Sequence, residues 1–84
     1  MAYSVSIKQS AAKQLEKVAW EERQRIIAAI EQLKINPSAG SVLKGEFSGL
    51  RRIRIGNYRV VYEVQDQQLV VLVIRVGHRR EVYR

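Results

Sequence analysis

The first residues of the chain alternate between apolar and polar side chains. Tyr3, Val5 and Ile7 are separated from one another by single polar residues. This period of two is typical of a β-strand that buries one of its faces. The pattern predicts a strand at the start of the sequence.

Two apolar stripes with helical spacing follow this strand. The first includes Leu15 and Val18, and Ser10 is placed to cap the start of its helix. The second stripe runs through residues 26–33. Asn36-Pro37 predicts its end, because the residue before a proline disfavours helical backbone.

The two stripes could belong to one long helix or to a helical hairpin. A continuous helix of about 26 residues would be long for so small a domain. We therefore predict a hairpin of two helices that breaks near residues 20–22. Trp20 is expected to pack between the helices and the sheet, without a chemical role.

The second half of the sequence predicts a loop and then an antiparallel sheet. The loop spans residues 37–49 and carries three apolar anchors: Val42, Leu43 and Phe47. Asp66-Gln67 predicts a turn into the apolar run of residues 69–76, whose β-branched character marks a central strand. Gly77 is expected to break that strand.

This order of elements predicts the α+β class, with an N-terminal strand, a helical hairpin and a three- to four-stranded antiparallel sheet. The helices are expected to pack on one face of the sheet. A chain of 84 residues with 46% hydrophobic residues is long enough for one modest core. We therefore predict a single domain over residues 1–84.

The clearest hairpin lies between Leu50 and Tyr62. Two runs rich in β-branched and aromatic residues flank Gly56-Asn57, a dipeptide that favours a two-residue turn. Such a turn pairs Arg54 with Arg59, and it separates the side chains into two faces. One face suits a core and holds Ile53, Ile55, Tyr58, Val60 and Tyr62, whereas the other carries Arg52, Arg54 and Arg59.

Like charges directly opposite each other across a hairpin repel and destabilise it. A basic face that keeps them is therefore expected to bind an anion, either a phosphate or an acidic protein segment. The alternative is a solvated face on which the aliphatic stems of the arginines cover apolar sheet. The convergence of three arginines favours anion binding.

Charge and composition support the same interpretation. The chain holds 15 Lys and Arg against 8 Asp and Glu, a net charge of +7, which indicates nucleic acid or an acidic partner. It has no cysteine and a single histidine, so neither a disulfide nor a zinc site is expected, and no cofactor is predicted. No apolar run has the length of a membrane span and no signal peptide is recognisable, so a cytoplasmic location without membrane contact is predicted.

A second basic cluster, residues 77–84, contains His78, Arg79, Arg80 and Tyr83. Cleavage of RNA requires removal of the 2′-hydroxyl proton, stabilisation of the developing phosphorane charge and protonation of the leaving oxygen. Arginine can stabilise charge but stays protonated, so His78 and Tyr83 are the candidates for proton transfer. The alternatives are a hydrogen-bonded surface histidine and a tyrosine that pins a terminal strand.

Four segments together resemble the RelE branch of the RelE/ParE toxin superfamily. They are Leu43-Lys44-Gly45, Gly49-Leu50-Arg51-Arg52-Ile53-Arg54, Asn57-Tyr58-Arg59-Val60-Val61-Tyr62 and Gly77-His78-Arg79-Arg80-Glu81-Val82-Tyr83. The resemblance implies a ribosome-dependent messenger-RNA endonuclease of a type II toxin–antitoxin system that acts in the ribosomal A site. It also implies metal-free attack by the 2′-hydroxyl, which leaves a 2′,3′-cyclic phosphate and a free 5′-hydroxyl.

The resemblance also implies roles for individual residues. Arg59 and Arg79 would hold the scissile phosphate, and Tyr83 would orient or deprotonate the attacking hydroxyl. Arg52 and Arg54 fall where characterised relatives carry lysines, so they keep the charge but not an easily transferred proton. His78 is a departure within the tail that would add a second proton-transfer group. The remaining basic positions of the motifs are expected to bind RNA: Arg51, Lys44 and Arg80.

The same resemblance implies the partners, namely the ribosome with its messenger RNA and a RelB-like cognate antitoxin. Operator DNA would be contacted only through the antitoxin. Two other functions use the same scaffold. One is a ParE-like inhibitor of DNA gyrase that cuts nothing, and the other is an inactive relative that only binds RNA or an acidic partner.

Overall fold

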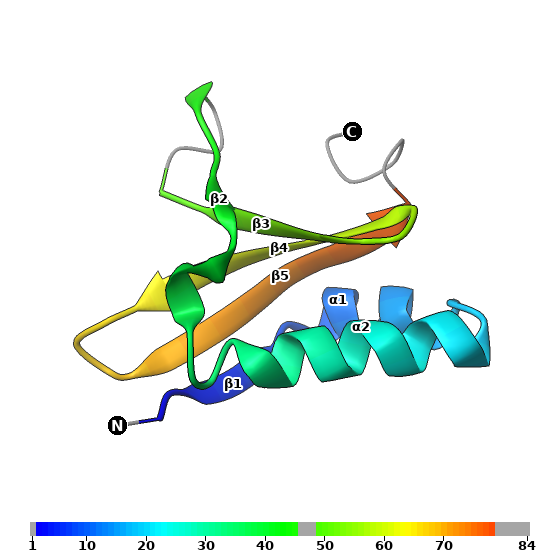
Figure 1. The fold of residues 1–84 in the computed structure, drawn as a ribbon, viewed down its shortest axis with the longest axis horizontal. Coiled ribbons are helices and arrows are strands. Elements are labelled where there is room, and N and C mark those ends of the chain that lie inside the picture. Colours follow the sequence, from blue (N-terminus) through cyan, green and yellow to red (C-terminus); the bar gives the residue numbers. More distant parts are fainter. Residues whose placement is uncertain (1, 46–48, 79–84) are drawn as a thin grey trace.

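A computed structural model of the chain describes residues 2–45 and 49–78 (Figure 1). Its helices and strands follow the predicted order. They are β1 (Ser4–Ile7), α1 (Gln9–Glu16), α2 (Trp20–Gln32), a short 3-10 turn η1 (Pro37–Ala39), β2 (Ser41–Val42), β3 (Arg51–Ile55), β4 (Tyr58–Gln65) and β5 (Val70–His78). Neither of the helices in these residues combines the length and the apolar character that crossing a membrane requires.

The five strands form one sheet in the order β1-β5-β4-β3-β2. β1 runs parallel to β5, and the other neighbouring pairs are antiparallel. β5 therefore lies between β1 and β4, which confirms that the continuous apolar run is a central strand. The predicted antiparallel part of three to four strands is present as the four strands β2 to β5. β1 adds a fifth strand, which pairs with β5 in parallel.

Both helices cover the same face of the sheet, while the other face carries no helix among residues 2–45 and 49–78 (Figure 1). The larger core cluster joins them to the strands through Leu15 of α1, Ile26 and Ile30 of α2, Val60 of β4 and Val73 of β5. The apolar stripes of the two helices thus pack against the buried side chains of the strands. The predicted α+β class, with a helical hairpin on one face, is confirmed.

The hairpin breaks at residues 17–19, slightly before the predicted position, and this changes the role of Trp20. Val18 in the break is buried, with 6% of its surface exposed. Trp20 is the first residue of α2 and is 65% exposed. The prediction that Trp20 packs between the helices and the sheet is wrong, because the turn places Val18 in the core instead.

Ser10 does not cap α1, so that prediction is also wrong. The helix begins at Gln9, its N-cap is Lys8, and no side chain caps it. Lys8 has extended backbone; its N–H donates to the Val73 carbonyl (2.9 Å), and its own carbonyl accepts from Ala12 N–H (2.9 Å). The helix starts directly where β1 ends, which leaves Ser10 inside the first turn.

Two further expectations for the second half are corrected. Gly77 does not break β5, since it pairs with Arg59 and the strand continues to His78. Val42 is not an apolar anchor, because it lies in the short edge strand β2 and is 57% exposed. Leu43 is half-buried, and Phe47 lies outside the described residues.

Tyr62 ties the segment before β2 to the centre of the sheet. Its side chain is fully buried, its hydroxyl accepts from Gly40 N–H (2.9 Å), and it donates to the Pro37 carbonyl (2.8 Å). The backbone approaches so closely that a Cβ on Gly40 would lie 2.6 Å from the Arg52 carbonyl oxygen. One phenol therefore fixes the chain that leads into the edge of the sheet.

We predict that Tyr62→Phe lowers the free energy of unfolding by about 1–3 kcal/mol, because it leaves the buried Gly40 N–H without its acceptor. Urea unfolding of the variant and the parent measures the difference. An unchanged midpoint would show that the segment is held by other contacts.

The same variant should remove a loss of stability at high pH. Burial raises the pKa of Tyr62 above its ordinary value of 10.0, against the opposing effects of Gly40 N–H and the Arg51 charge. A raised folded pKa leaves stability complete below pH 10 and reduces it as pH rises through the folded value. Above pH 10, the stability of the parent should therefore fall more steeply with rising pH than that of Tyr62→Phe. Thermal unfolding at several pH values measures this difference.

Candidate functional site

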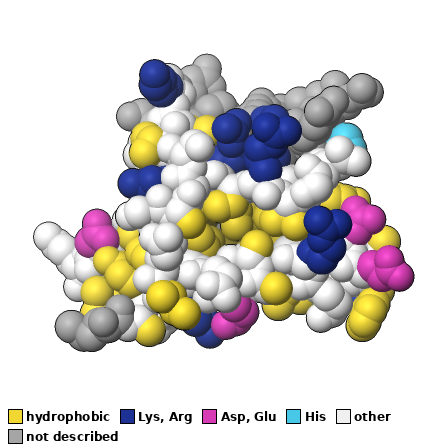
Figure 2. Space-filling view, in the orientation of Figure 1, with side chains coloured by type: hydrophobic (Ala, Val, Ile, Leu, Met, Phe, Trp, Pro, Cys, Tyr) yellow, Lys and Arg dark blue, Asp and Glu magenta, His cyan; other side chains and the backbone are white. Residues whose placement is uncertain are grey.

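The helix-free face of the sheet carries the arginines of the hairpin. The observed register pairs Ile55 with Tyr58, Arg54 with Arg59 and Ile53 with Val60, as the turn predicted. Alternation along the strands then directs Arg52, Arg54 and Arg59 away from the helices. We call the surface formed by these three residues the arginine face. Figure 2 shows a group of Lys and Arg side chains above the sheet, on the side away from the helices.

The arginine face has an apolar floor and a glycine beside it on β5. Val61 pairs with Arg52 on β3, lies on the same face, and is only 2% exposed. The Nε atoms of Arg52 and Arg59 are buried, so their stems cover part of this floor. On β5 the residue beside Arg59 is Gly77, which carries no side chain that could fill the space. The face therefore combines covered stems with a neighbouring strand position that bears no side chain.

A cavity of about 270 Å³ adjoins the arginine face at the β2 edge. It is lined by Gly40 and Ser41 on one side and by Arg52 and Arg54 on the other. Tyr62 and Arg51 hold its Gly40 side, since Arg51 Nη1 donates to the Gly40 carbonyl (2.8 Å). The wall is thus held rigidly beside two cations, which suits an anion.

Arg51 itself lies on the opposite side of β3 from Arg52. It pairs with Tyr62, in phase with the residues that face the core, and donates to backbone carbonyls of the segment before β2. The structure therefore places Arg51 behind the cavity wall and not on the arginine face. Lys44 is exposed and follows β2.

His78 is one residue out of phase with the arginine face. It pairs with Tyr58, which packs against the core, and the two rings meet edge to face with centroids 5.9 Å apart. Directly paired residues project to the same side of a sheet. The register therefore separates His78 from Arg59, whose partner is Gly77. The other tail candidates, Arg79, Arg80 and Tyr83, lie outside the described residues.

Arg75 lies beside the arginine face, although its position in the apolar run of residues 69–76 did not predict it as a site residue. Regular alternation from Val73 would turn Arg75 toward the helices. The ladder between β4 and β5 shifts instead, so that Val61 pairs with Arg75 and Tyr62 with Val73, leaving Ile74 as an extra residue. This irregularity buries Val76 and turns Arg75 outward. In the sequence, the apolar Val76 interrupts the alternation that runs from Val73. This interruption was the signal that could have predicted the outward position of Arg75.

No group of three His, Asp or Glu side chains in residues 2–45 and 49–78 could hold an ion. What the arrangement offers is fixed positive charge on a sheet surface. Such a surface can bind and stabilise phosphate oxygens.

The sequence matches a known family over nearly its whole length. A family model described as the ParE toxin of type II toxin-antitoxin system, parDE, matches residues 5–83. Toxin RelG of Mycobacterium tuberculosis is 30% identical over 90 residues, which cover 100% of this chain and 99% of RelG. Toxin RelE of the same organism is 31% identical over 88 residues, which cover 98% of this chain and 87% of RelE.

The fold agrees with this similarity. The crystal structure of the toxin-antitoxin complex RelBE2 from Mycobacterium tuberculosis contains a chain that superposes with a TM-score of 0.86 and 28% identity. The alignment covers 93% of this chain and 99% of that chain. Fold and sequence together define the toxin component of a type II toxin–antitoxin system. The chain belongs to the RelE/ParE toxin superfamily, as the four motifs suggested.

We predict that Arg54→Thr stabilises the isolated protein. The substitution removes a like-charge pair at a cross-strand position and supplies a β-branched residue, which should raise the free energy of unfolding by ~0.2–1 kcal/mol. Because exposed charges are screened, the gain should shrink between low and high salt. Urea unfolding at two salt concentrations measures both. A destabilised variant would show that Arg54 contributes more through its stem than it costs through repulsion.

Proposed function

We propose that this toxin is a ribosome-dependent endoribonuclease that cleaves messenger RNA in the ribosomal A site and so inhibits translation. The observation that carries the proposal is the arginine face, where like charges are held directly opposite each other beside a glycine. Such a surface is costly to keep without an anionic ligand. The phosphodiester of RNA is an anion that brings its own nucleophile, so the site needs no metal to cleave it.

The mechanism follows from what these side chains can do. The 2′-hydroxyl attacks the adjacent phosphorus, the 5′-oxygen of the next nucleotide leaves, and a 2′,3′-cyclic phosphate forms. Arg59 and Arg79 would hold the phosphate and stabilise the negative charge of the phosphorane. Arg52 and Arg54 would bind neighbouring phosphates as fixed cations, with Arg80 and Lys44 as further RNA contacts. None of these arginines can act as the base.

Removal of the 2′-hydroxyl proton is assigned to Tyr83, and the leaving 5′-oxygen takes a proton from water. Nearby guanidinium groups lower the pKa of a phenol and favour its use as a base. His78 pairs with Tyr58 on the other side of the sheet from Arg59, so we give it a positioning role at the end of β5. Arg51 is likewise proposed to hold the cavity wall and to act on RNA only through it.

An antitoxin is the expected protein partner. The similar RelBE2 structure is a toxin-antitoxin complex, and we propose that this toxin is bound by a RelB-like antitoxin with an acidic segment over the arginine face. Charge complementarity with a chain of net charge +7 supports it. Operator DNA would be reached through that antitoxin, and the toxin would act in the cytoplasm on ribosomes.

A second candidate function is inhibition of DNA gyrase without RNA cleavage. The matched family model is named for ParE, and the arginine face could bind a protein surface equally well. Both functions arrest growth, but they damage different molecules.

Growth arrest tests the arginine face directly. Expression without antitoxin should arrest growth for the parent, and either Arg59→Ala or Arg79→Ala should relieve the arrest. Arg23→Ala is the matched control, because this arginine of α2 donates to the Glu16 carbonyl at the end of α1, on the helical side of the sheet. If both variants stay as toxic as the parent at equal expression, the phosphate-binding role is wrong.

The target can be identified in the arrested cells and then with purified components. Primer extension should show breaks within translated codons, and one purified message should be cut only when programmed ribosomes are present. Intact messages together with stabilised double-strand breaks in DNA would instead establish the gyrase inhibitor. Cleavage of the free message at the same rate would remove ribosome dependence from the proposal.

A further inference from the structure

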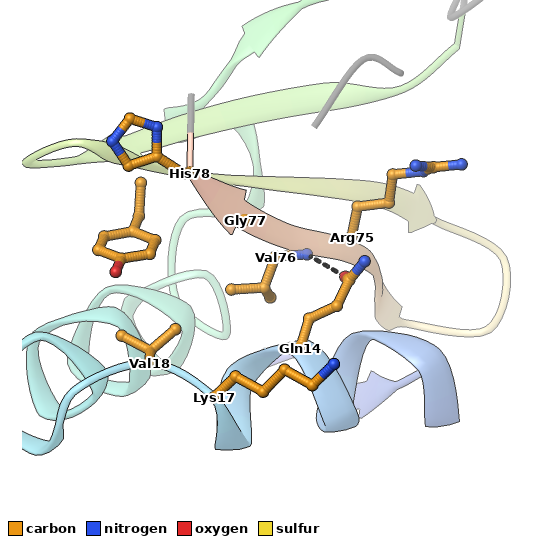
Figure 3. Close-up of a pocket in the computed structure, with 8 residues that line it drawn as sticks. Gln14, Lys17, Val18, Arg75, Val76, Gly77 and His78 are labelled. Carbon is orange, nitrogen blue, oxygen red and sulfur yellow. Dashed lines mark hydrogen bonds between the residues drawn. The ribbon is translucent and has the colours of Figure 1, made fainter. Parts of the chain in front are cut away.

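The end of β5 has a free edge that no other strand covers within the described residues. β1 pairs with β5 only as far as Val73, whereas β5 continues to His78. The Val76 N–H at this edge donates instead to Gln14 Oε1 of α1 (2.9 Å). A side chain thus replaces the missing strand at one position, and a hollow remains beside it (Figure 3).

That hollow is a cavity of about 480 Å³ between the end of α1 and the end of β5. Its size is within the ~300–1,000 Å³ range of small-ligand sites. The residues that matter for its chemistry are Gln14, Lys17, Tyr58, Arg75 and His78. None of the described residues that line it is acidic.

Two cations stand on different walls of the cavity. Lys17 comes from the end of α1, and Arg75 comes from β5, where the shifted ladder turns it toward the helix-free side. Val61 lies between Arg75 and Arg52 in the paired strands. A chain of phosphates bound on the arginine face can therefore continue to Arg75 and over the edge of the sheet to Lys17.

The remaining walls offer groups that recognise a base. The rings of Tyr58 and His78 form an edge-to-face pair that lines the cavity. Aromatic rings of this kind bind bases of single-stranded RNA by stacking. Since Gln14 accepts from Val76 through Oε1, its amide nitrogen keeps donors for a base edge.

We propose that this cavity is a nucleotide subsite for single-stranded RNA, occupied by a nucleotide next to those bound on the arginine face. Its phosphate lies between Lys17 and Arg75, and its base lies against His78 and Tyr58. The proposal rests on the proposed function in taking RNA as the ligand. Continuity with the arginine face, together with aromatic walls, favours RNA over an acidic protein segment, which would need neither the rings nor a hollow beside them.

Binding of a 2′-O-methyl RNA oligonucleotide, which cannot be cleaved, tests the subsite separately from catalysis. Fluorescence anisotropy of the full chain at several salt concentrations measures the affinity and its salt dependence. Lys17→Gln and Arg75→Gln should each weaken binding and reduce the log–log salt slope by roughly 0.7, the value for one phosphate contact on a single strand. Lys13→Gln is the matched control, an exposed lysine one turn earlier on α1 that does not line the cavity.

A second substrate tests the base site. A set of oligonucleotides carries a single abasic position at different places along the strand. One of them should bind the parent several-fold more weakly than the intact oligonucleotide, and His78→Ala should abolish that difference. A variant that has merely lost stability is not expected to lose this difference selectively. Circular dichroism would reveal such a loss of stability.

The outcomes separate this proposal from the proposed function. Reduced slopes in Lys17→Gln and Arg75→Gln, with no ribosome-dependent cleavage by the parent, would keep the subsite and reject the nuclease. Slopes equal to those of Lys13→Gln, or a parent that does not bind the oligonucleotide, would overturn the subsite whatever the cleavage assay shows. If Lys17→Gln and Arg75→Gln bind the oligonucleotide as the parent does but lose binding to an acidic antitoxin peptide, the cavity belongs to a protein partner and the subsite is overturned.

Discussion

The pairing of Arg54 with Arg59 across the β3–β4 hairpin is the constraint on which the candidate site depends. Two arginines are held at directly paired positions because the opposite face of the same strands is anchored in the core. Val60 and Tyr62 of β4 are fully buried, so a slip of one residue would expose them and bury the arginines. Because burying charge is costly, the β3–β4 register is maintained. This register keeps Arg54 and Arg59 opposite each other despite their repulsion.

The rest of the sheet adapts to this hairpin. Gly77 of β5 places no side chain beside Arg59, and the extra residue Ile74 allows Val73 and Val76 both to reach the core. Without that irregularity, strict alternation would place Arg75 among the helices. One inserted residue thus exchanges a buried charge for a surface one, and it extends the basic surface toward the edge of the sheet.

The segment before β2 shows how a core residue supports a surface site. Tyr62 lies in the core, yet its hydroxyl and the guanidinium of Arg51 hold the backbone around Gly40. That backbone forms one wall of the cavity beside Arg52 and Arg54. Arg51 is expected to bind RNA as a basic position of the family motif that it shares with Arg52 and Arg54. In a strand, however, adjacent residues point to opposite faces, so Arg51 and Arg52 lie on different sides of β3.

The sequence by itself determined the hairpin register, the division of its faces, the pair of helices and the family. These features follow from local periods and from a two-residue turn, and both act over a few residues. Tertiary structure alone decided which side of β5 carries Arg75 and His78, and that Val18 is buried while Trp20 is exposed. The reason is that a strand irregularity or a helix break shifts the phase of every residue after it, and its position depends on partners distant in the chain.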